Sequence, residues 1–142
     1  MILLDAYALV ALLRDEPAAE DVERLIKEEE TAATAVNLAE AVEVAQRVHG
    51  LALNDVEAAL EPLFPDTVDL LSVQQADAWR AAEIRVRHYH RSQRPLSLAD
   101  CFLLAASGSE DAIATSDPAV AETARLEQLG VVALPDSSGH LP

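Results

Sequence analysis

Short apolar segments alternate along this chain with longer segments that have a helical period. Strands are expected at the apolar segments, which are residues 2–4, 31–36, 68–71, 112–115 and 131–134. Helices are expected between them, at residues 6–14, 17–30, 38–49, 53–63, 74–91, 98–107 and 118–129. Because parallel strands need crossover connections, this alternation predicts an α/β domain with a central, mostly parallel sheet of four to five strands.

The length of 142 residues indicates a single domain over residues 1–142, with residues 135–142 as a loose tail. No apolar run approaches the ~20 residues that a membrane-spanning helix needs. The start of the chain also lacks the basic and apolar regions of a secretory signal. We therefore expect a cytoplasmic protein without a membrane partner.

The formal net charge of −15 comes from 25 acidic and 10 basic residues, which disfavours non-specific binding to nucleic acid. Half of the basic residues lie within residues 80–94, together with His88, Tyr89 and His90. This segment is the expected exception, and its arginines fit either phosphate contacts or ion pairs with neighbouring acids. The single cysteine, Cys101, has apolar neighbours and is expected to be a small buried residue.

Four carboxylates follow the predicted strands or begin the helices beside them: Asp5, Glu40, Asp100 and Asp117. Each one taken alone is also explained as a helix cap. The sequences Asn37-Leu-Ala-Glu40 and Ser97-Leu-Ala-Asp100 are typical of capping boxes, and proline follows Asp117. Because ligands of parallel sheets bind beyond the carboxyl ends of the strands, the acids also mark the expected functional edge.

The four acids taken together indicate a metal site. Apolar residues flank them, so they are expected to be partly buried and to repel one another unless a cation lies among them. Oxygen ligands favour Mg²⁺ or Mn²⁺. Zinc is disfavoured because His88 and His90 fall on different faces of a helix, and Cys101 has no basic neighbour that would make it a nucleophile.

Four segments, MILLDAYALVALL, NLAEAV, LSLADCFLLAAS and IATSDPAV, resemble in order and spacing the acidic motifs of PIN-domain ribonucleases, specifically the VapC-like toxins of toxin–antitoxin pairs. The resemblance implies a three-layer α/β/α fold. It implies that Asp5, Glu40, Asp100 and Asp117 bind metal and catalyse, with Thr115 in support. The chain departs from the family at Tyr7, where Ser or Asn is common.

The activity implied by the resemblance is Mg²⁺-dependent hydrolysis of RNA, with Mn²⁺ as a substitute, leaving a 5′-phosphate and a 3′-hydroxyl. Asp5 and Asp100 are the expected direct ligands, and Glu40 is a ligand or positions the attacking water. Basic side chains at the mouth of the site are expected to bind RNA: Arg87, Arg91 and Arg94.

The expected protein partners are a cognate antitoxin over residues 6–13 and 38–48, and a second copy in a homodimer or a hetero-oligomer. Trp79 is expected in the core or at the dimer face.

Two other functions remain open at this point. A degenerate PIN domain would bind RNA or protein without cutting, and Tyr7 keeps this alternative open. A Mg²⁺-dependent phosphotransfer or receiver-type domain would also place acids at strand ends. That class usually needs a lysine near the last strands, but the only lysine here is Lys27.

Overall fold

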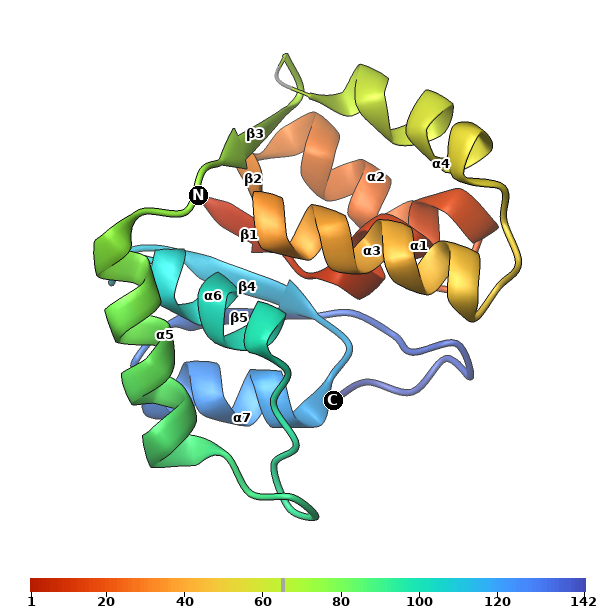
Figure 1. The fold of residues 1–142 in the computed structure, drawn as a ribbon. Coiled ribbons are helices and arrows are strands. Elements are labelled where there is room, and N and C mark those ends of the chain that lie inside the picture. Colours follow the sequence, from red (N-terminus) through yellow and green to blue (C-terminus); the bar gives the residue numbers. More distant parts are fainter. Residues whose placement is uncertain (65) are drawn as a thin grey trace.

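The computed structural model describes residues 1–64 and 66–142, which form a five-stranded parallel sheet between two layers of helices (Figure 1). The strands are β1 (Ile2–Leu4), β2 (Thr31–Thr34), β3 (Val68–Leu71), β4 (Ala112–Thr115) and β5 (Gly130–Ala133), in the order β3-β2-β1-β4-β5. The helices are α1 (Ala6–Arg14), α2 (Ala19–Glu28), α3 (Ala35–Arg47), α4 (Leu53–Leu60), the 3₁₀ turn η1 (Glu61–Leu63), α5 (Gln75–His88), α6 (Leu98–Ala106) and α7 (Pro118–Leu126). The predicted α/β fold with a central parallel sheet is confirmed.

Two hydrophobic cores lie on opposite faces of the sheet. Helices α1 to α4 contribute to the core that contains Leu4, and helices α5 to α7 contribute to the core that contains Leu3. Both leucines are fully buried. Because successive side chains of a strand point to opposite faces, the two residues of β1 join the two layers. Cys101 lies in the second core, as predicted.

One boundary error concerns the start of α3. Strand β2 ends at Thr34, whose side chain accepts a hydrogen bond from the backbone N–H of Asn37 at 3.0 Å and caps α3. The expected capping box between Asn37 and Glu40 is therefore wrong, and the helix begins three residues before the predicted start. Glu40 consequently lies in the second turn of α3, and neither of its carboxylate oxygens caps the helix.

Other helices are shorter than the spacing of their apolar residues predicts. Helix α5 ends at His88, before a loop in which the backbones of His90 and Arg94 pair with each other. Helix α7 ends at Leu126 rather than at the predicted residue 129, because the backbone leaves the helical region at Gln128, whose φ is 62°. Strand β5 then begins at Gly130. A Cβ atom at this glycine would lie 2.9 Å from the Cβ of Ala112, so the close approach of β5 to β4 requires glycine.

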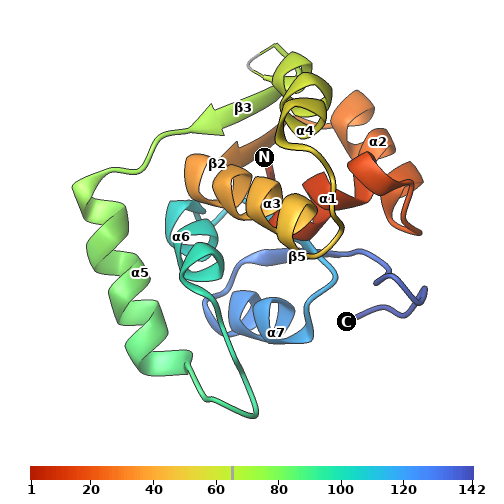
Figure 2. The ribbon, with the colours of Figure 1, turned by 45° about the vertical axis from the view of Figure 1, so that its right-hand side comes forward.

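Helix α5 runs along one side of the molecule, apart from α1 and α2 (Figure 2). Its outward face carries Trp79, which is 68% exposed, and Val86, which is 88% exposed. The expectation that Trp79 packs in the core is wrong, which leaves a protein contact face as its predicted place. In the part of the chain that the structure describes, no helix combines the length and apolar character that crossing a membrane requires.

Candidate active site

The crevice between β1 and β4 is the point at which the sheet changes its direction of winding. Strands β2 and β3 lie beyond β1, whereas β5 lies beyond β4. Asp5 directly follows β1, and its backbone N–H donates to the carbonyl of Ala114 in β4 at 3.2 Å. Asp117 follows β4 after one intervening residue. Two predicted acids therefore flank the place where open parallel sheets bind their ligands.

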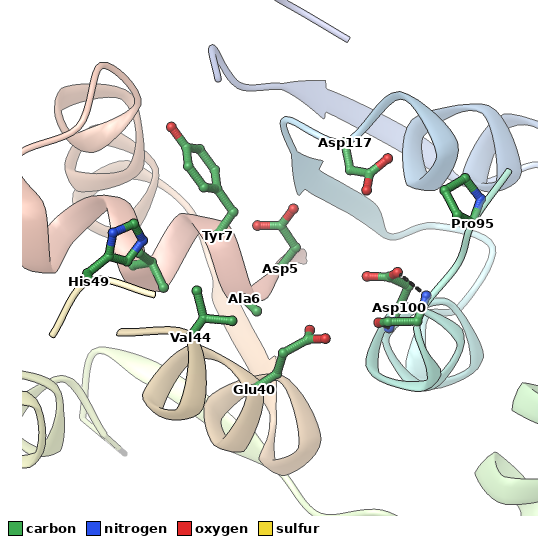
Figure 3. Close-up of a pocket in the computed structure, with 11 residues that line it drawn as sticks. Asp5, Ala6, Tyr7, Glu40, Val44, His49, Pro95, Asp100 and Asp117 are labelled. Carbon is green, nitrogen blue, oxygen red and sulfur yellow. Dashed lines mark hydrogen bonds between the residues drawn. The ribbon is translucent and has the colours of Figure 1, made fainter. Parts of the chain in front are cut away.

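Glu40 and Asp100 reach the same crevice from helices. Glu40 comes from α3, which follows β2, and Asp100 comes from the first turn of α6, which precedes β4. All four acids line one cavity of about 290 Å³, and Figure 3 shows their carboxylates facing a common space. The structure thus brings together all four acids that the sequence singled out.

Three of the four acids are helix caps as well, as the sequence predicted. The backbone N–H of Ala8 donates to Oδ1 of Asp5 at 2.7 Å, and the N–H of Ala119 donates to Oδ1 of Asp117 at 2.6 Å. Ser97 and Asp100 form a reciprocal capping box at the start of α6. In each cap a single carboxylate oxygen accepts the helix amides. Among the described residues, no backbone amide donates to the second oxygen of these carboxylates.

Burial strongly perturbs the acids of this cavity. Asp5 is 4% exposed, and this burial raises the pKa of its carboxyl to about 7, with smaller contributions from the charges of Asp100 and Asp117. Burial also raises the pKa of Asp100 and of Glu40, and a neighbouring carboxylate adds to each shift. None of the described residues that line the cavity is Lys or Arg. The cavity is a place where positive charge from outside the chain would be stabilising.

The donor set fits a hard divalent cation, since the side chains that face the cavity offer carboxylate oxygens. Yet within residues 1–64 and 66–142 no three His, Cys, Asp or Glu side chains stand close enough together to ligate one ion. The expected tight cluster of four carboxylates is therefore looser than predicted. Mg²⁺ commonly takes only one or two protein carboxylates and keeps several waters. The spacing suits that form of binding.

Two hydroxyl residues connect the acids to one another. Thr115 is fully buried; its Oγ1 accepts from the backbone N–H of Asp117 at 3.0 Å, and its hydroxyl lies near enough to Asp5 to oppose the rise in the pKa of that carboxyl. Ser97 accepts from the N–H of Asp100 at 3.0 Å, and its hydroxyl also lies near enough to Glu40 to counteract part of the rise in the pKa of that residue. The resemblance implied a supporting role for Thr115, whereas the sequence pattern at Ser97 indicated only a helix cap.

Sequence analysis also missed His49, which lines the cavity beside Tyr7. His49 lies just beyond the end of α3, where the sequence offers no motif that would connect it to the acids. The Nη1 atom of Arg14 lies 2.5 Å from its Nδ1 atom. Only the packing of α3 against α1 brings these residues together.

The arginines proposed to bind RNA lie in and after the last turn of α5, outside the cavity lining. Arg87 pairs with Glu127 at 2.6 Å, and Arg94 pairs with Glu122 at 2.6 Å. Arg91 is exposed and has no ion pair with the described residues. Two of these three side chains thus form ion pairs with acids of the α7 region, which is the alternative to phosphate contacts that the sequence left open.

Comparison with known families decides the class of this fold. The profile of the PIN domain matches residues 2–126, which include all four acids. The chain belongs to the PIN domain family. A comparison with curated protein sequences finds no match.

Solved structures resemble this PIN domain over most of its length. FitAcB from Neisseria gonorrhoeae is 26% identical, with a TM-score of 0.62, and the match covers 92% of this chain and 96% of that chain. DNA-bound VapBC from Salmonella typhimurium is 16% identical, with a TM-score of 0.66 and the same coverage. VapC20 from Mycobacterium tuberculosis, a toxin that cleaves the sarcin-ricin loop, is 21% identical, with a TM-score of 0.60 over 74% of this chain and 79% of that chain.

Proposed function

We propose that this PIN domain is a divalent-metal-dependent endoribonuclease and the toxin of a toxin–antitoxin pair that acts in the cytoplasm. The observation that carries the proposal is the convergence of Asp5, Glu40, Asp100 and Asp117 on one cavity at the switch point of the sheet. Family membership and the likeness to VapC and FitAB structures support the same function.

Mg²⁺, or Mn²⁺ in its place, would supply Lewis-acid activation of water and neutralise the charge that develops on the phosphate. Asp5 and Asp100 would hold the ion, because each has one oxygen fixed by a backbone amide and a second oxygen to which no backbone amide of the described residues donates. Glu40 makes no cap and is half-buried at the cavity, which suits a ligand or an acceptor of the water's proton. Asp117 would complete the site, and Thr115 would hold Asp5 and Asp117 in register.

Basic side chains beside the cavity would hold the RNA backbone. Arg91 is the best candidate, since it is exposed and has no ion pair with the residues described. Arg87 and Arg94 would have to exchange Glu127 and Glu122 for phosphates. Such exposed pairs are weak, about 0–1 kcal/mol, so the exchange costs little.

An antitoxin is the expected protein partner, and an apolar hollow of about 570 Å³ between α3, α4 and β3 offers it a surface. Its walls include Leu38 and Val42 of α3, and Glu57 and Glu61 lie at its edge. Residues 8–11 of α1 are buried in the core and are not available to a partner. An amphipathic segment with basic flanks would match both the hollow and the net charge of −15.

A second copy of the chain fits the exposed face of α5. Trp79, Ala82 and Val86 lie three to four residues apart and form one apolar stripe. In an antiparallel pair of α5 helices, Trp79 of each copy would meet Val86 of the other, with the small Ala82 near the twofold axis. Such self-complementarity is what a symmetric dimer requires.

Incubation of the purified protein with single-stranded RNA tests the proposed function. We expect cleavage in Mg²⁺ or Mn²⁺, no cleavage in EDTA, and products that carry 5′-phosphates. Binding of RNA without cleavage would favour the degenerate PIN domain instead. Formation of an adduct between Asp5 and a phosphate analogue would favour phosphotransfer.

A further inference from the structure

The cavity has a second half that the four carboxylates do not occupy. It is lined by Ala6, Tyr7 and Val10 of α1 and by Val44 and His49 at the end of α3. Figure 3 shows the rings of Tyr7 and His49 on the side away from Pro95 and Asp100. Holding a metal and a phosphate requires charged oxygens and does not require this apolar floor with two aromatic rings.

Tyr7 is an unusual residue for this position. Its ring packs against the first core, and its hydroxyl is buried without a hydrogen-bond partner among the described residues. A buried hydroxyl without a partner lowers the stability of the fold. In Figure 3 the hydroxyl points away from the carboxylates, so what Tyr7 presents beside them is the ring and not the hydroxyl. This differs from the small polar residue that is common in the family.

His49 is held in one orientation by Arg14. A guanidinium can only donate, so the 2.5 Å contact makes Nδ1 of His49 the acceptor and places the ring proton on Nε2. The same Nη1 atom of Arg14 also pairs with Glu16 at 2.8 Å. The imidazole is therefore a fixed ring that offers one N–H donor.

We propose that this half of the cavity, the Tyr7–His49 subsite, binds the nucleobase next to the scissile phosphate of single-stranded RNA. The inference rests on the proposed function. Proteins that recognise single strands stack unpaired bases on aromatic rings and hydrogen-bond to their edges. At about 290 Å³ the whole cavity is at the small end for a ligand site, which suits one nucleotide.

Variants at Tyr7 and His49 test the subsite with a random pool of single-stranded RNA. We expect Tyr7→Leu, which keeps apolar bulk, to raise KM about tenfold with kcat within about twofold, since stacking contributes to binding. Tyr7→Phe keeps the ring and should match the wild type. Sequencing of the cut ends should show a base preference beside the cleavage site that Tyr7→Leu and His49→Ala flatten. Leu126→Ala removes an exposed apolar side chain outside the cavity and should change neither KM nor the preference.

An unchanged KM and an unchanged base preference in Tyr7→Leu would overturn the subsite while leaving the ribonuclease function intact. A Tyr7→Phe variant as impaired as Tyr7→Leu would also overturn it, because stacking does not depend on the hydroxyl. Binding of a short RNA is measured in parallel by fluorescence anisotropy in an Asp100→Asn background, where we expect cutting to be at least about 100-fold slower. A wild-type chain that neither cuts nor binds RNA would overturn the subsite together with the proposed function.

Discussion

Oδ1 of Asp5 accepts a hydrogen bond from the backbone N–H of Ala8 at 2.7 Å, so a residue of the candidate metal site also caps the first helix. The cap uses one oxygen and a local hydrogen bond. It leaves the charge of Asp5 buried beside two other carboxylates, which a cap alone does not explain. The two roles of this residue can therefore be separated by experiment.

Asp5→Asn should keep the cap and remove the buried charge, because asparagine caps helices about as well as aspartate. A pKa of about 7 against an ordinary value of 3.8 corresponds to about 4 kcal/mol of destabilisation when Asp5 is ionised. We expect the metal-free variant to be more stable than the wild type at pH 8 and inactive on RNA. Chemical denaturation in EDTA measures this, and a variant less stable than the wild type at pH 8 would reduce Asp5 to a cap.

The pH dependence of stability follows from the same group. Between about pH 4 and 7 the folded metal-free protein binds a proton at Asp5 that the unfolded chain has already lost. The free energy of unfolding of the metal-free protein should therefore fall at Asp5 as pH rises through this range. Asp5→Asn should lack this part of the pH dependence. Added Mg²⁺ should raise the melting temperature more at pH 8 than at pH 5, since the ion competes with the proton. An equal rise at both pH values would contradict metal binding at Asp5.

Ser97→Ala should affect activity beyond its effect on the fold. Loss of the cap costs about 1 kcal/mol. Loss of the link between Glu40 and Asp100 should lower the cleavage rate about tenfold or more, as for other residues that orient metal ligands. Ser97→Thr should restore both. Asp77→Ala removes a cap of α5, which carries none of the cavity residues, and should lower stability alone. Equal activity in Ser97→Ala and Asp77→Ala would reduce Ser97 to a cap.

Arg91→Ala combined with Arg94→Ala should weaken RNA binding without unfolding the chain. Each lost phosphate contact should lower the slope of log affinity against log salt by about 0.7 for a single strand. Glu122→Gln is the matched control, because it breaks the same ion pair but frees Arg94 for RNA. We expect its affinity to equal or exceed that of the wild type. Unchanged RNA affinity in the double variant would remove these arginines from the interface.

Trp79→Ser with Val86→Ser should convert a dimer into a monomer, as measured by light scattering. The two side chains are 68% and 88% exposed in a single chain, and their loss removes the apolar stripe without disturbing a core. The control is Leu53→Ser, which replaces an exposed leucine of α4 and should leave the mass of the particle in solution unchanged. A monomeric wild type, or a dimeric double variant, would contradict the proposed α5 interface.

Position in the strand pattern made Asp5 and Asp117 predictable, because an acid within two residues of the end of a parallel strand lies at the functional edge. The cap of α3 was mispredicted because the segment TAATAVN offers both Thr34 and Asn37 as caps, and propensity alone does not choose between them. His49 and Arg14 lie 35 residues apart and meet only through helix packing, for which the sequence carries no local signal. The ion pairs of Arg87 and Arg94 with α7 were missed for the same reason.

The most direct test of the proposed nuclease centre compares the cleavage of single-stranded RNA by the wild type and by Asp100→Asn. Both proteins are purified by the same procedure and assayed in Mn²⁺. Asparagine still accepts the hydrogen bond from Ser97 that Asp100 accepts at 2.6 Å, so the fold and the cap should survive. We predict cleavage by the wild type, dependent on the metal, and a rate at least about 100-fold lower in the variant. Equal cleavage by both proteins would attribute the activity to a contaminant and contradict the assignment of these carboxylates to a nuclease centre.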